Sequence, residues 1–103
     1  MDIPAVLPEP EDVEGLEPGA AEHFIELAEE NMQYAEQLRE EGKFSEALDI
    51  LFSVERLSGG LSLKAESQEL FQRFGALNST AQEMVGEIQR SGEFREMRNK
   101  GLK

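Results

Sequence analysis

A regular apolar seam in the second half of the chain most constrains its fold. From residue 63 to residue 88, apolar side chains recur at alternating steps of four and three residues, interrupted only at Ser67. This is the spacing of a helix that buries one stripe against its neighbours. The alternative is a break near Gly75, followed by a second helix with Ser79 and Gln82 as its capping box. Because the phase continues across Gly75, we predict a single helix from Ser62 to Ser91, about 44 Å long at 1.5 Å per residue. The seam consists of Leu63, Leu70, Phe74, Leu77, Ala81, Met84 and Ile88.

Two shorter amphipathic segments precede the seam. The first is predicted to be helical from Ala20 to Glu41 and to end at Gly42, a residue suited to the left-handed conformation that follows many helices. The second is predicted to run from Phe44 to Leu57 and to end at Gly59-Gly60. The short connection between them favours an antiparallel αα-hairpin. The expected fold class is therefore all-α: an αα-hairpin plus a long third helix, forming a three-helix bundle over residues 20–91.

The two ends of the chain differ from this domain in composition. Residues 1–19, called the arm below, contain all four prolines, six acidic residues and no basic residue, which is typical of a disordered segment. Two interpretations of the arm stay open. It is either a solubilising tail or a linear motif whose aliphatic side chains dock in a groove. Residues 92–103 form a mildly basic tail.

Charge limits the classes of partner. The net charge of the chain is −12, and the first 41 residues, with thirteen acidic and one basic residue, account for all of it. Such a chain is repelled by nucleic acid and by anionic lipid, so neither is expected as a partner. No apolar run approaches the roughly 18 residues of a membrane span, and no basic, apolar leader is present, so we expect no membrane insertion and a cytoplasmic location.

The residues that usually support catalysis are few. The chain has no cysteine, which removes thiolate nucleophiles and thiolate metal ligands, and His23 is its only histidine, on a segment rich in glutamate. Adjacent acidic pairs such as Glu29-Glu30 do not share one helix face. We therefore predict no catalytic, cofactor-binding or metal-binding residues, and a chain that is not an enzyme.

The segment from Tyr34 to Leu51 resembles the core of a tetratricopeptide hairpin. In that family, small, glycine and aromatic residues recur at fixed offsets around a tight helical turn. The matching positions here are Ala35, Leu38, Gly42, Phe44, Ala47 and Leu51. The chain departs from the family pattern at Asn31, Tyr34, Val54 and Gly59, and it contains no second copy of the motif 34 residues away.

The region from Ala20 to Ser91 also resembles the three-helix MIT domain of ESCRT-associated proteins. The specific stretch is Gly42 to Ala47, a glycine and an aromatic residue followed by Glu-Ala. The resemblance implies a third helix packed beside the hairpin, and a groove between helices that binds a short helix of a partner protein.

These observations favour a protein-binding function. We expect an adaptor or a small subunit of a larger complex, which docks a partner helix on its apolar seam or in a groove between helices. The partner is another protein or a second copy of the chain. The alternative is a small acidic chaperone that shields a client before assembly or export. Because the second helix is expected to be short, the distal seam should project beyond it, and its predicted partner-binding residues are Leu77, Met84, Val85 and Ile88.

Overall fold

The first long helix, α1, spans Pro18–Glu40 in a computed structural model that describes residues 3–14 and 17–91. Proline begins the helix, where its missing N–H costs nothing. Gly42, with a φ of 80°, ends it. The Gly42 N–H donates to the Arg39 carbonyl at 3.0 Å and the Lys43 N–H to the Leu38 carbonyl at 2.8 Å, the bonding pattern of a Schellman motif. The predicted stop at Gly42 is confirmed.

The second helix, α2, spans Phe44–Lys64 and is longer than the sequence suggested. The predicted end near Leu57 is wrong, because the helix continues through Gly59 and Gly60. Each glycine costs a helix about 1 kcal/mol relative to alanine. Leu57 and Leu61 on either side of the pair are 2% and 0% exposed, and their burial offsets that cost.

The third helix, α3, spans Gln68–Arg90 and follows a short connection. The Ser67 side chain caps its start by accepting a hydrogen bond from the Leu70 N–H at 3.1 Å. The predicted start at Ser62 is therefore wrong, and Leu63, the first residue of the seam, belongs to α2. The predicted continuity through Gly75 is confirmed.

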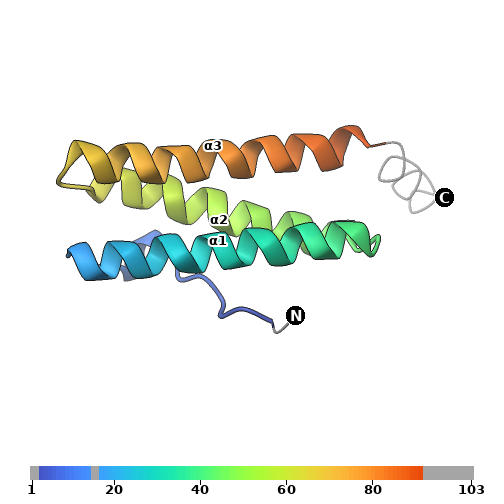
Figure 1. The fold of residues 1–103 in the computed structure, drawn as a ribbon, viewed down its shortest axis with the longest axis horizontal. Helices are drawn as coiled ribbons and strands as arrows, with labels where there is room; N and C mark the ends of the chain where they lie inside the picture. The colour runs from blue at the N-terminus through green and yellow to red at the C-terminus, as the bar shows by residue number, and fades with distance from the viewer. Residues whose placement is uncertain (1–2, 15–16, 92–103) are drawn as a thin grey trace.

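The three helices run up, down and up, with α2 in contact with both others (Figure 1). The α2–α3 and α1–α2 pairs pack most extensively, whereas α1 and α3 meet over a narrower front. The expected all-α three-helix bundle is confirmed. In the part of the chain that the structure describes, no helix is long and apolar enough to cross a membrane.

The core divides into two clusters along the bundle. One lies around Phe74, at the end where α2 leads into α3, and it includes Leu7 and Val13 from the arm. The other lies near the α1–α2 turn, and its buried members are Ala35, Leu38, Phe44, Ala47, Leu48, Leu51, Val85 and Ile88. Most of the residues that resemble a tetratricopeptide hairpin are thus core residues of one cluster.

The described part of the arm, residues 3–14, lies against the bundle. It includes a single 3₁₀ turn, η1, at Pro10–Asp12, and crosses beneath α1 and α2 (Figure 1). Leu7 is 9% exposed and Val13 is 6% exposed. Two aliphatic side chains of this extended, acidic segment thus pack against the core. That the arm is disordered stays a prediction. The basic tail at 92–103 lies outside the described residues.

Candidate protein-binding surfaces

The predicted partner-binding residues divide between core and groove. Val85 is 7% exposed and Ile88 is 1% exposed, and both pack in the cluster near the α1–α2 turn. The expectation that the distal seam projects beyond its neighbours is wrong. Since α2 has 21 residues and α3 has 23, α2 runs beside nearly the full length of α3. Neither buried side chain is available to a partner in this conformation.

Leu77 and Met84 are half-buried and face α1. Leu77 packs on the Phe74 cluster, and Met84 packs on the other cluster. With Ile25 of α1, Leu77 lines a hollow of about 240 Å³ between α1 and α3. The structure thus brings one predicted site residue to an inter-helix groove.

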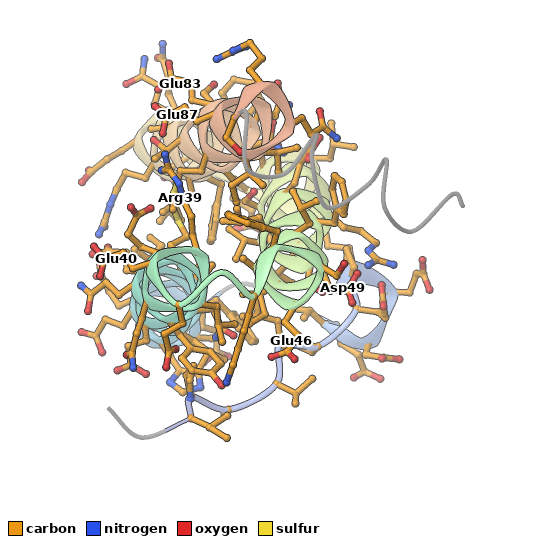
Figure 2. The ribbon with its side chains drawn as sticks, turned by 90° about the vertical axis from the view of Figure 1, so that its right-hand side faces the viewer. Arg39, Glu40, Glu46, Asp49, Glu83 and Glu87 are labelled. Carbon is orange, nitrogen blue, oxygen red and sulfur yellow. The ribbon has the colours of Figure 1, made fainter. Side chains whose placement is uncertain are left out.

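Ion pairs bridge this α1–α3 groove along its length. Arg73 donates from both terminal nitrogens to the Glu22 carboxylate, and its Nη2 lies 3.1 Å from Oε2. The hydrogen bond from Arg73 holds the pKa of Glu22 below its ordinary value of 4.5. Farther along, Arg39 Nη1 lies 3.2 Å from Glu87 Oε2, and Figure 2 shows this arginine pointing from α1 toward α3. Both pairs cross the groove near its surface, since all four side chains are at least 31% exposed.

The opposite side of α3 is open, and the residues that α3 itself contributes there are uncharged. We define the α2–α3 flank as Phe52, Gly59 and Leu63 of α2 with Phe71, Gly75, Asn78 and Gln82 of α3, which share faces by helical spacing. Three of these are large apolar side chains exposed to solvent: Phe52 at 41%, Leu63 at 84% and Phe71 at 51%. A hollow of about 440 Å³ lies at its centre, lined by Phe52, Glu55, Arg56, Gly59 and Asn78.

The flank is distinguished by where the charges of α3 lie. Gln68, Gly86 and Gln89 continue the outer edge of α3 beyond the flank, so that no position of this edge is charged. Four of the five charged residues of α3 lie on its other faces. The fifth, Arg90, is the last residue of the helix, and its guanidinium lies over Gly86 at the far end of the edge. Two of them, Arg73 and Glu87, form the ion pairs to α1. Charges make up 31% of the chain, so an uncharged edge of this length is a distinct surface.

A third surface, the face formed by α1 and α2, is occupied by the arm. Asn31 Nδ2 donates to the Ala5 carbonyl at 3.1 Å, and Lys64 Nζ donates to the carbonyls of Pro10 and Val13, the latter at 2.7 Å. Beside these contacts, a hollow of about 180 Å³ lies between the arm and the two helices. Its lining residues are Ile3, Pro4, Val6, Leu7, Asn31, Tyr34, Asp49, Ile50 and Ser53.

Sequence reasoning missed both the flank and the contacts of the arm. The only available signal was Gly59-Gly60, which was interpreted as a helix end. In the structure both glycines allow close approach. A Cβ at Gly59 would lie 3.2 Å from Asn78 Nδ2, and one at Gly60 would lie 2.6 Å from Pro10 Cγ.

No three histidine, aspartate or glutamate side chains among residues 3–14 and 17–91 gather as a metal ion requires. His23 is exposed, with its ring 5.6 Å from that of Phe24. That the chain is not an enzyme stays a prediction.

Compared with protein-family models, curated proteins and solved structures, the chain shows no significant match. The resemblances to tetratricopeptide hairpins and MIT domains therefore stay predictions.

Proposed function

We propose that this chain is a non-enzymatic protein-interaction module, an adaptor or small subunit that docks a partner helix along the α2–α3 flank. The observation that supports the proposal is the uncharged outer edge of α3 beside three exposed apolar side chains, Phe52, Leu63 and Phe71. Exposed apolar surface on a highly charged small protein is characteristic of an interaction site.

The energetics favour a partner at this place. A phenylalanine side chain buries roughly 150–250 Å² in a packed interface, at about 25 cal/mol per Å². Phe52 and Phe71 are about half exposed. Covering the remainder of both rings contributes about 2 kcal/mol each by this measure. The edge of α3 adds no charged position to the covered surface, so the cost of burying ions is limited to Glu55 and Arg56 of α2, which line the central hollow.

The geometry fits a helix. Phe52 and Leu63 lie on one face of α2, three turns apart, or about 16 Å at 1.5 Å per residue. A partner helix that packs on the flank, along α2 and α3, would contact Phe52 and Leu63 with two of its own side chains that are also three turns apart. Gly75 of α3 lowers the surface beside this span, since nothing lies within 4 Å of the position that its Cβ would take. The partner should present apolar and small uncharged residues, because the flank offers few charged groups to pair.

Site-specific photo-crosslinking tests the proposal. A photo-reactive phenylalanine analogue replaces Phe71, and in a matched control it replaces His23, which is exposed on α1. The chain is expressed in its native source and irradiated. We expect a discrete crosslinked protein from position 71, mapped to a helix in that protein, and none from position 23. Equal crosslinking from both positions, or none from position 71, would contradict the proposal.

A further inference from the structure

The arm is attached to the bundle by contacts that a separate peptide could also make. The described part, residues 3–14, is mostly extended, and the groups that hold it belong to α1 and α2. Asn31 and Lys64 donate hydrogen bonds to its backbone carbonyls, which every peptide possesses. Backbone recognition of an extended segment, with pockets for alternate side chains, is a recurring mode of peptide binding.

The side chains of the arm supply the specificity of this contact. Pro10 lies directly over the α-carbon of Gly60, at a distance that leaves no space for a Cβ on that glycine. Leu7 and Val13 enter the core cluster around Phe74. Arg56 approaches the Glu9 carboxylate at 3.5 Å, a pair that is exposed on both sides. The groups of α1 and α2 that contact the arm are together called the seat. They are Asn31, Arg56, Gly60 and Lys64.

The arm fills this face incompletely. Ile3 is 76% exposed and Val6 is 91% exposed, although both line the hollow of about 180 Å³ beside α1 and α2. The arm is also acidic, and it lies on a helix whose exposed surface contains many glutamates. A segment with larger side chains at these positions and fewer acids would fit the same face better.

We propose that the seat is a binding site for extended, proline-containing aliphatic segments, and that residues 3–14 are its resident, exchangeable ligand. The external occupant is a segment of a partner protein with the chemistry of the arm. It has a proline that packs on Gly60, two aliphatic side chains that enter the core, and backbone carbonyls that accept hydrogen bonds from Asn31 and Lys64. This site adjoins the α2–α3 flank at Arg56, which also lines the hollow there, but it does not depend on the function proposed for the flank.

Peptide binding to a chain with a released arm tests the proposal. In the full-length chain, Leu7→Ser with Val13→Ser removes the anchors of the arm and leaves the seat intact. The probe is a fluorescent synthetic peptide with the sequence of residues 3–14, and its anisotropy is measured. We expect binding at least tenfold tighter than to the wild-type chain, whose tethered arm competes at an effective concentration of about millimolar.

Two further substitutions assign the binding to the seat. Adding Gly60→Ala to the released-arm variant should weaken peptide binding at least tenfold, because the methyl group occupies the position of the proline ring. Adding Gly75→Ala should leave binding unchanged, since nothing lies within 4 Å of a Cβ at that position. Peptide binding that is no tighter than to wild type, or that is indifferent to Gly60→Ala, would overturn the proposal.

If the released-arm variant does not fold, a second measurement tests whether the arm is an exchangeable ligand. Gly60→Ala is made in the otherwise unchanged chain, and backbone heteronuclear NOE values are recorded for residues 3–14 and for the helices. We expect the values to fall in the arm alone, as for a displaced ligand. If the arm keeps its values, or if the helices unfold with it, the arm is a fixed part of the core and the proposal fails.

Discussion

Asn78 of α3 donates a hydrogen bond to the backbone carbonyl oxygen of Glu55 on α2, with Nδ2 2.7 Å from that oxygen. Gly59, one turn after Glu55, leaves the space that the amide occupies. The contact joins the two helices that form the flank, so it holds Phe52 and Phe71 in a fixed relation.

Replacing this amide should destabilise the bundle moderately. Asn78→Ala removes a partly buried hydrogen bond worth about 1 kcal/mol, which lowers the thermal midpoint of a domain of this size by about 4–8 °C. The control Gln89→Ala changes an exposed residue on the same edge of α3 and should shift the midpoint little. Thermal unfolding followed by circular dichroism measures both. Equal shifts would mean that the Asn78 contact contributes nothing.

Two buried alanines should be equally intolerant of charge. Ala47 and Ala81 are both 0% exposed, one in each core cluster. Either change to aspartate buries an unpaired carboxylate at a cost of several kcal/mol. An α3 that extends past its neighbours, as expected from the sequence, would instead make Ala47→Asp the more damaging change. Comparable loss of helicity in both variants supports the structure, and a well-folded Ala81→Asp variant would contradict it.

The far end of the seam should now behave as core. Ile88→Ser removes a side chain that is 1% exposed, and we expect a loss of about 3 kcal/mol by analogy with large-to-small core substitutions. Met84→Ser should cost less, since Met84 is only half-buried. Denaturant titration measures both free energies of unfolding. An Ile88→Ser variant as stable as wild type would restore the earlier view of a projecting seam.

The Glu22–Arg73 ion pair should make a small contribution that depends on pH. The pKa of Glu22 is lowered in the folded state, so its contribution is fully present above pH 4.5 and is lost as the pH falls through the depressed folded-state value. Glu22→Gln should therefore lower the thermal midpoint slightly at neutral pH and not at all in strong acid. Added salt should also shrink the difference. Glu26→Gln, an exposed change on the same helix, is the control. A Glu22→Gln effect that is independent of pH would contradict the assignment.

The sequence predicted those features of the fold that local chemistry determines. Gly42 has a positive φ, the helix before it ends where expected, and the phase of the seam correctly identified α3 as continuous through Gly75. The end of α2 was missed because Gly59 and Gly60 indicate a helix end when the sequence is considered alone. Their role depends instead on close tertiary contacts with Asn78 and Pro10, which are distant in the sequence.

The candidate sites were less accessible to sequence reasoning. The spacing of Val85 and Ile88 is the same whether a helix packs against its own chain or against a partner, so periodicity could not tell core from interface. The flank depends on the absence of charge along one edge of α3, which becomes visible only once the ion pairs of Arg73 and Glu87 show which edge faces α1.

The most direct test of the account is whether the flank, and not exposed apolar surface in general, retains a partner. Proteins recovered with the tagged chain from its native source are quantified by mass spectrometry for wild type, for Phe52→Ser with Phe71→Ser, and for Ile3→Ser with Val6→Ser. The last pair removes exposed apolar side chains from the arm. We expect wild type and the arm variant to recover the protein that is crosslinked from position 71. We expect the flank variant to lose it at a temperature where circular dichroism shows all three chains to be folded. Retention of that protein by the flank variant would contradict the central claim.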